Sequence, residues 1–234
     1  MATTETERPS TRTPRPLILG IGGSERPAGN TDIALERAGE LVRSRGARFE
    51  AIQLRDFDIS PCSPCGDCNS RTTLCAVRDD TPAIVARMKA ADGIIYATPV
   101  HGFGLAHLMQ IFIEHVGVGH LRFERPLANK VGGAIITSRR YSDSHVYHQI
   151  VDNILLNRMI LVGSGFPALM RNSSDVPGMF DTESTDALER MVHRMVDMVE
   201  LLRERTAVRG EPVLPTVDIN ERVVRQRGPE RTLI

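Results

Sequence analysis

The sequence has no tryptophan, and aromatic residues account for only 4% of its 234 positions. Aromatic platforms, on which proteins stack the bases of single-stranded nucleic acids, are therefore not expected. Neither sign of charge is in excess, because 29 Lys and Arg residues balance 29 Asp and Glu residues. This balance gives no electrostatic reason to expect a nucleic-acid partner or binding to an anionic membrane surface.

Long apolar runs are also missing. No segment approaches the roughly 20 consecutive apolar residues that a membrane helix needs. Residues 1–15 lack the apolar stretch of a secretory signal peptide. These absences predict a cytoplasmic protein that does not span a membrane.

Apolar residues nevertheless make up 41% of the chain, and its length suits one α/β domain with tails. Residues 1–15 and 206–234 are rich in Pro and Arg, and neither segment shows helix or strand periodicity. We predict a flexible amino-terminal tail (1–15), one folded domain (16–205) and an extended carboxyl-terminal tail (206–234). Apolar side chains scattered among Pro and Gly in the last segment favour packing against a neighbouring subunit.

Within the domain, short β-branched runs alternate with longer amphipathic segments, which is typical of βαβ units and a parallel sheet. The expected strands are residues 17–22, 48–54, 92–98, 131–137 and 160–163. The expected helices begin near residues 29, 81, 105, 144 and 184, with Thr81 as an N-cap and Pro82 as the first helical residue. This succession matches a flavodoxin-like, doubly wound, five-stranded parallel sheet of order 2-1-3-4-5, which binds ligands beyond the carboxyl ends of its strands.

The first expected strand leads into a loop suited to an anion. The loop reads Gly22-Gly23-Ser24-Glu25-Arg26-Pro27-Ala28-Gly29-Asn30-Thr31 and opens a helix, whose first N–H groups and dipole attract negative charge. Ser24, Asn30 and Thr31 can donate hydrogen bonds. Arg26 can supply a fixed positive charge. The glycine patterns of dinucleotide and nucleoside triphosphate sites are absent, and an ordinary capped turn is the alternative.

All four cysteines fall in one segment, at Cys62, Cys65, Cys68 and Cys75. Three cysteines at successive two-residue gaps, followed by a more distant fourth, are typical of thiolates that wrap around one iron–sulfur cubane. Structural zinc usually takes two separated Cys-x-x-Cys pairs, and stable disulfides are not expected without an export signal. A cluster is the leading interpretation, while redox-active or metal-free thiols and a zinc site remain open.

The pattern Gly23-Ser24-x-Arg26-x-x-Gly29-Asn30-Thr31 resembles the FMN-phosphate loop of the NADPH-dependent FMN reductase and iron–sulfur flavoprotein family. The order of motifs is similar over about residues 17–167. The resemblance implies that FMN is bound through Ser24, Arg26, Gly29, Asn30 and Thr31. It also implies that the loop after the second strand, residues 57–79, carries a 4Fe-4S cluster on Cys62, Cys65, Cys68 and Cys75.

The loop after the third strand is expected to carry the isoalloxazine ring, because it lies at the carboxyl end of a central strand. The expected contacts there are Thr98, Pro99, Val100, His101, Gly102 and Phe103. The expected contacts after the fourth strand are Thr137, Ser138 and Arg139. The family usually has an aromatic residue where His101 stands and a Gly-rich turn after the fourth strand, so this chain departs from it at both places.

The resemblance implies a flavin-dependent oxidoreductase in which FMN couples two-electron to one-electron chemistry and the cluster relays single electrons. NAD(P)H is a candidate donor, and a small molecule or a redox protein is the expected partner. The alternatives are a cluster-free NAD(P)H-dependent FMN or quinone reductase and a non-enzymatic flavin-binding electron carrier. A homodimer or homotetramer is expected. The remaining histidines, at positions 107, 115, 120, 145, 148 and 193, show no spacing that indicates a metal site.

Overall fold

A computed structural model describes residues 14–63, 65, 68, 75–122, 124–172 and 174–215 of the chain. Most of the predicted amino-terminal tail, residues 1–13, lies outside the described residues. So do residues 216–234 of the predicted carboxyl-terminal tail. The packing of that tail against a neighbouring subunit therefore stays a prediction.

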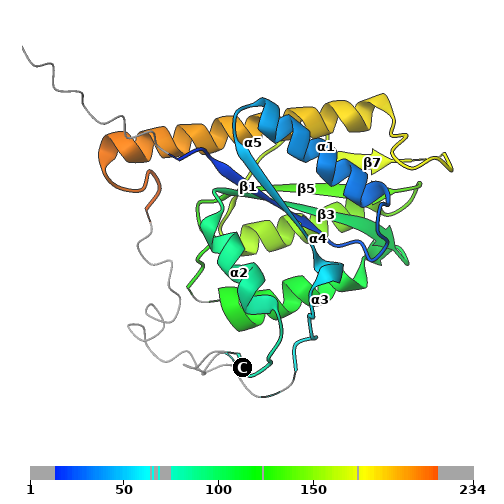
Figure 1. The fold of residues 1–234 in the computed structure, drawn as a ribbon, viewed down its shortest axis with the longest axis horizontal. Coiled ribbons are helices and arrows are strands. Elements are labelled where there is room, and N and C mark those ends of the chain that lie inside the picture. Colours follow the sequence, from blue (N-terminus) through cyan, green and yellow to red (C-terminus); the bar gives the residue numbers. More distant parts are fainter. Residues whose placement is uncertain are drawn as a thin grey trace, which may run out of the picture.

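A parallel sheet forms the centre of the fold (Figure 1). Its strands are β1 (Leu17–Gly22), β2 (Arg48–Gln53), β3 (Gly93–His101), β5 (Val131–Ser138) and β6 (Ile160–Leu161). They lie in the order β2-β1-β3-β5-β6, and each neighbouring pair is parallel. The predicted flavodoxin-like order 2-1-3-4-5 is confirmed.

Two short strands, β6 and β7 (Ala168–Arg171), share the fifth position of the sheet. Strand β7 pairs with β5 in the same direction as β6 but further along. Between β6 and β7 the chain turns through Gly165, whose φ of +89° favours glycine. The short prediction for the last strand, 160–163, therefore covered only the first part of this edge.

Two layers of helices cover the sheet (Figure 1). Helices α1 (Asn30–Ser44) and α5 (Thr182–Arg209) lie on one face. Helices α2 (Thr81–Ala90), α3 (His107–Val116) and α4 (Asp143–Leu156) lie on the other.

Strand β1 shows why both faces are covered. Leu19 and Ile21 point into the core beneath α2, α3 and α4, whereas Ile18 points into the core beneath α1 and α5. Successive side chains of a strand face opposite sides. A strand that is apolar on both sides is stable only in a sheet buried on both faces.

Two predicted boundaries differ from the structure. The N-cap of α2 is Asp80 rather than Thr81, and the backbone N–H of Thr81 donates to the carboxylate of Asp79 at 2.9 Å. Helix α5 continues to Arg209, beyond the predicted domain boundary at 205. Its last turns are polar and exposed, so they carry no apolar period to mark them, and Gly210 ends the helix with a φ of +73°.

The predicted loop after the third strand is mostly strand. Strand β3 continues to His101, and a two-residue turn at Gly102 and Phe103 leads to β4 (Gly104–Leu105), which pairs with β3 in the antiparallel direction. Both turn residues have positive φ, +53° and +66°, as the tight hairpin turns that match strand twist require. The strand predicted at 92–98 ended too early because the polar residues that follow it interrupt the apolar run.

Within the described part of the chain, no helix combines the length and the apolar character that a membrane crossing needs.

Candidate functional site

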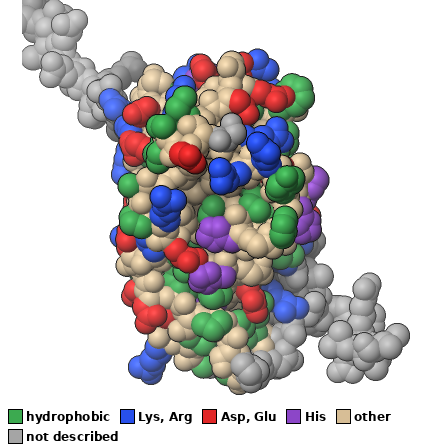
Figure 2. All heavy atoms as spheres, turned by 90° about the vertical axis from the view of Figure 1, so that its right-hand side faces the viewer, with side chains coloured by type: hydrophobic (Ala, Val, Ile, Leu, Met, Phe, Trp, Pro, Cys, Tyr) green, Lys and Arg blue, Asp and Glu red, His purple; other side chains and the backbone are tan. Residues whose placement is uncertain are grey.

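The register of the sheet brings the predicted flavin loops to one edge. Gly22 of β1 pairs with Ala97 of β3, and Pro99 of β3 pairs with Thr137 of β5. The residues that follow emerge at the carboxyl edge, next to the switch point between β1 and β3 where doubly wound sheets bind ligands. Figure 2 views this side of the molecule, and His, Lys and Arg side chains gather around its middle.

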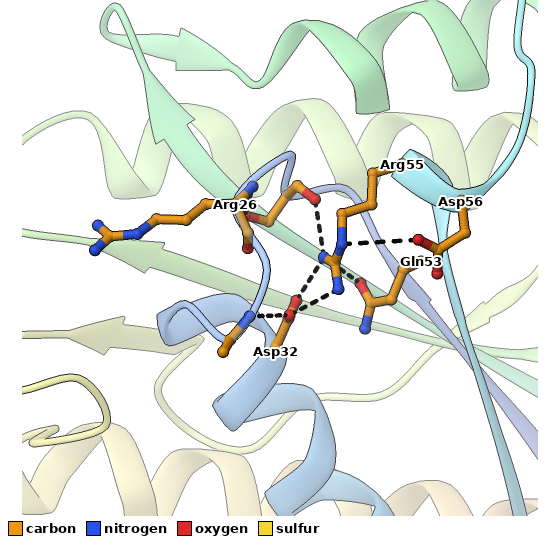
Figure 3. Close-up of polar contacts among 7 residues, drawn as sticks. Arg26, Asp32, Gln53, Arg55 and Asp56 are labelled. Carbon is orange, nitrogen blue, oxygen red and sulfur yellow. Dashed lines mark hydrogen bonds and ion pairs between the residues drawn. The ribbon is translucent and has the colours of Figure 1, made fainter.

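The loop after β1 leaves the start of α1 open. Gly29 is the N-cap, and no side chain caps the helix by a hydrogen bond. Unpaired N–H groups at a helix start are available to an anion. Arg26 is exposed and extends away from the neighbouring polar network (Figure 3), and no carboxylate among the described residues pairs with it. These features suit a phosphate group.

Ser24 shapes this loop from within. Its side chain is buried, and its Oγ accepts from the N–H of Arg26 at 3.2 Å and donates to the carbonyl of Arg26 at 3.3 Å. The hydroxyl that was expected to bind a ligand therefore also holds the turn that presents Arg26.

Arg55 braces the loop from the neighbouring strand (Figure 3). It lies just after β2, in the short 3-10 turn η1 (Leu54–Asp56). Its guanidinium donates to the two carboxylate oxygens of Asp32 at 3.0 and 2.9 Å and to the carbonyl of Ser24 at 3.1 Å. Asp32 also accepts from the N–H of Ala28 at 2.8 Å. Because Ala28 has a φ of +54°, this hydrogen bond holds a conformation that alanine rarely adopts.

Replacing Arg55 with methionine is expected to weaken FMN binding about tenfold, which corresponds to about 1.4 kcal/mol. The methionine keeps an apolar stem but leaves the carboxylate of Asp32 without its cation, close to the loop that faces the phosphate. The unpaired negative charge repels the ligand, and the loop loses its brace. Fluorescence titration of the apoprotein with FMN measures the change.

A second substitution separates the two effects. Asp32→Asn in the Arg55→Met background removes the unpaired charge and is expected to restore part of the affinity. Arg37→Met, at an exposed position of α1, is the matched control and should bind FMN normally. If Arg55→Met binds FMN as tightly as the unchanged chain, Arg55 does not organise the site.

Hydrogen bonds join the start of α1 to two other edge segments. The hydroxyls of Thr31 and Thr137 lie 2.7 Å apart, and both side chains are buried. The side-chain oxygen of Asn30 accepts from the amide of Asn172 at 3.1 Å and from the N–H of Gly178 at 2.8 Å. The structure thus brings together predicted site residues that are more than a hundred positions apart, and it shows that they also hold the edge together.

The residues predicted on β3 differ in exposure. Thr98 is fully buried, and its hydroxyl donates to the carbonyl of Pro99 at 3.3 Å. Pro99 and Val100 are half-buried. His101, Gly102 and Phe103 form the exposed tip of the hairpin, which projects beyond the sheet edge.

Beyond β5, Ser138 belongs to a polar group with Asp143 and Arg171. Nε of Arg171 donates to the carboxylate of Asp143 at 2.7 Å, and the hydroxyl of Ser138 donates to it at 3.4 Å. Burial alone would raise the pKa of Asp143, but the hydrogen bonds and the charge of Arg171 outweigh it and lower the pKa. Arg139 is exposed and meets Asp175 at 3.8 Å, a contact that solvent screens, so its charge is available to a ligand.

The cysteine segment starts and ends on neighbouring backbone. The N–H of Asp58 donates to the carboxylate of Asp80 at 2.8 Å, and the N–H of Ser60 donates to Asp79 at 3.0 Å. These bonds close the base of the loop that carries the cysteines.

The segment above this base carries all four cysteines. No disulfide joins any of the four cysteines, all of which are described. Burial raises the pKa of Cys62, and the negative charges of Glu114 and of the other three cysteines raise it further. A bound cation relieves this kind of repulsion, so the thiols suit a positively charged metal centre.

Two histidines lie beside the last cysteine. Sγ of Cys75 is 3.4 Å from Nε2 of His115 in α3. His120, in the π-helical turn η2 (Gly117–Leu121), completes a group whose ligand atoms all lie within 4.8 Å of one another. Sequence spacing had indicated no metal site at these histidines. The structure nevertheless groups His115 and His120 with Cys75, which spacing could not reveal because the contact joins residues 40 positions apart.

Helix α3 contacts both candidate groups. At its start, Nδ1 of His107 lies 2.9 Å from the carboxylate of Glu25 in the anion loop. Met109 packs so closely against Gly23 that a Cβ there would lie 2.8 Å from the methionine side chain. Near its end, His115 meets Cys75.

The model of the protein family described as NADPH-dependent FMN reductase matches residues 16–172, which is more than half of the chain. The chain belongs to the NADPH-dependent FMN reductase family.

This FMN reductase family protein is 29% identical to an iron–sulfur flavoprotein of Methanocaldococcus jannaschii over 194 residues, covering 80% of this chain and 99% of the relative. It is 31% identical to an iron–sulfur flavoprotein of Methanosarcina thermophila over 192 residues, covering 80% and 97%. Among solved structures, it is similar to RosB with a bound 8-demethyl-8-formylriboflavin-5'-phosphate intermediate. The TM-score is 0.69 at 19% identity, with 95% of this chain and 90% of RosB covered, so this likeness shows the fold alone.

Membership of the FMN reductase family confirms three predictions: the family, the flavin-dependent oxidoreductase class and FMN as the flavin. A reductase of this family takes electrons from a donor and passes them to an acceptor. The open helix start, and Arg26 with no carboxylate partner among the described residues, fit the phosphate of FMN, and the four cysteines, which form no disulfide, fit a cluster.

Proposed function

We propose that this FMN reductase family protein holds FMN at the carboxyl edge of the sheet and passes electrons between an external donor, the flavin and a 4Fe-4S cluster. NAD(P)H is the proposed donor. The proposed phosphate contacts are Ser24, Arg26, Gly29, Asn30 and Thr31. The proposed ring contacts are Thr98, Pro99, Val100, His101, Gly102, Phe103, Thr137, Ser138 and Arg139, and the proposed cluster ligands are Cys62, Cys65, Cys68 and Cys75.

The observation that carries the cluster assignment is the placement of all four cysteines between positions 62 and 75, with no disulfide among them. Burial raises the pKa of Cys62, and nearby negative charges, those of the other cysteines included, raise it further. Hydrogen bonds to Asp79 and Asp80 close the base of the loop that carries these cysteines, which supports a shared site. Four thiolates in one small volume are the usual ligands of a cubane cluster.

The protein's own residues bind and orient the redox groups in this proposal. Arg26 and the open start of α1 neutralise the phosphate, while Arg55 and Asp32 keep the loop in position. When bound, FMN accepts a hydride and releases single electrons, and a cluster carries one electron at a time. No side chain is needed as an acid or a base for this exchange.

A homodimer or homotetramer is part of the proposal. Phe103, Tyr141 and Phe166 follow the ends of β3, β5 and β6, and they are 70%, 67% and 61% exposed. Three large aromatic side chains in solvent along the flavin edge suit a surface that a second subunit or a partner covers. A cytoplasmic location, the nature of the electron acceptor and the absence of nucleic-acid and membrane partners also stay predictions.

Purification without oxygen tests the proposal. We expect about one FMN per chain, four irons with matching acid-labile sulfide, and broad thiolate-to-iron absorption beneath the flavin bands. NADH or NADPH should then bleach the flavin first and the cluster absorption afterwards, because hydride enters at the flavin.

Other outcomes would support one of the two alternative functions. Flavin without iron, together with steady NAD(P)H oxidation, identifies a cluster-free reductase. Reduction only by a reduced redox protein identifies an electron carrier. A preparation that contains no flavin and takes up none on addition of FMN contradicts the proposed site.

A further inference from the structure

We propose that Cys75, His115 and His120 form a binding site for a single divalent metal ion when the chain carries no cluster. The ion is of the kind that accepts one thiolate and two imidazoles, for which Zn²⁺ is the best match. This site goes beyond the proposed electron transfer and does not depend on FMN.

The geometry of the first pair fits such an ion. Ligands of tetrahedral zinc lie about 2.3 Å (sulfur) and 2.0–2.1 Å (nitrogen) from the metal, which places sulfur and nitrogen roughly 3.5 Å apart. Sγ of Cys75 and Nε2 of His115 are 3.4 Å apart. All three ligand atoms lie within 4.8 Å of one another.

The other nitrogen of His115 is held by a carboxylate. Nδ1 lies 3.2 Å from the carboxylate of Asp79, and both side chains are fully buried. The hydroxyl of Thr81 lies 3.4 Å from the same nitrogen. A carboxylate that accepts a hydrogen bond from the Nδ1–H of a histidine leaves the lone pair on Nε2 for a metal and fixes the ring, as in many zinc sites.

Asp79 is itself fixed in place. It accepts hydrogen bonds from the N–H groups of Ser60 at 3.0 Å and Thr81 at 2.9 Å, which belong to the two ends of the cysteine segment. The orientation of His115 is therefore set by backbone and does not depend on the ligand.

His120 supplies an independent observation. Its Nε2 is buried and has no hydrogen-bond partner among the residues that the structure describes. The ring centroids of His120 and His115 are 5.6 Å apart. His120 lies in a π-helical turn, and such turns are frequent at functional sites. A metal ion would satisfy this nitrogen.

Binding of the metal ion changes the protonation of the ligand groups. The Cys75 thiol releases its proton to solvent and binds as a thiolate, while each histidine donates a neutral nitrogen lone pair. Water fills the fourth position. The ion fastens the end of the cysteine segment to α3 and η2.

Cobalt(II) provides the probe, because its colour reports both coordination number and thiolate ligation. Full-length protein is produced under iron limitation, loaded with FMN and titrated with Co²⁺ under anaerobic conditions. We expect one Co²⁺ per chain, a thiolate-to-cobalt charge-transfer band and the strong visible bands of tetrahedral cobalt, all removed by Zn²⁺. His120→Gln and Asp79→Asn are each expected to lower the Co²⁺ affinity about 10- to 100-fold.

The controls separate this site from a site made of cysteines alone. His148→Gln, at an exposed position of α4, should bind Co²⁺ normally, and so should Cys62→Ser. If Cys62→Ser abolishes binding while His120→Gln does not, the four cysteines form the site and the proposal is overturned. Failure of the unchanged protein to bind Co²⁺ overturns it as well.

Flavin content measured on the same samples keeps the result interpretable. FMN retention shows that a variant is folded and tests the anion loop separately. Loss of the metal site therefore differs from failure of the proposed flavin function. His115 is buried in the core, so substitutions there are expected to destabilise the fold. Variants of His120 and Asp79 are therefore used for the test.

Discussion

Serine in place of Cys65 is expected to remove all 4Fe-4S cluster from the purified protein while FMN stays bound. A serine hydroxyl does not replace the thiolate of a cubane cluster, and the loop offers three cysteines in its absence. The flavin is unaffected because its phosphate loop follows β1, whereas the cysteine segment follows η1. Iron and acid-labile sulfide assays, together with flavin absorbance, measure the result.

Ser63→Ala is the matched control for this variant. Ser63 is exposed in the same segment. Its backbone carbonyl accepts a hydrogen bond from the N–H of Cys65 at 2.7 Å, and alanine keeps this carbonyl. The control should keep its full iron content. A Cys65→Ser protein that retains four irons per chain would show that Cys65 is not a ligand.

Alanine in place of Arg26 is expected to weaken FMN binding by about 1.5–3 kcal/mol, or roughly 10- to 150-fold, the range of a charge-assisted hydrogen bond. Arg26 has no carboxylate partner in the described structure that would have to be released, so the whole effect falls on the ligand. The free energy of unfolding of the apoprotein should stay within about 0.5 kcal/mol of its original value, as for most exposed substitutions. FMN titration and urea unfolding give the two numbers.

Arg37→Ala separates local from general electrostatics. Arg37 lies on the exposed side of α1, the helix that follows the anion loop, and its replacement by alanine removes the same charge as Arg26→Ala. If both alanine variants weaken FMN equally, the effect comes from net charge and the phosphate-loop assignment fails.

The order of the sheet could be predicted because the signals that define it are local. The apolar runs of β1, β3 and β5 are separated by amphipathic helices, and such alternation permits few topologies. Boundaries were less certain. The β3–β4 hairpin depends on the backbone conformation of Gly102 and Phe103. The positive φ of a phenylalanine cannot be predicted from the sequence.

The residues of the candidate site likewise fall into those that local sequence patterns revealed and those that they did not. The anion loop and the cysteine quartet are continuous in the chain, so spacing alone revealed them. Arg55 and His115 were missed because their partners, Asp32 and Cys75, are 23 and 40 positions away. Such pairings depend on how α1, β2 and α3 pack, and neither arginine nor histidine is unusual enough by type to indicate a role.

Helix α3 acts as a spacer of fixed length between the two proposed redox sites. From His107, beside the anion loop, to His115, beside Cys75, there are eight residues, or about 12 Å at 1.5 Å per residue. Electron transfer slows steeply with distance, and a helix packed in the core by Met109, Phe112 and Val116 cannot stretch. The anchoring points of the two loops therefore keep a constant separation, which would fix the distance that an electron crosses between the two proposed sites.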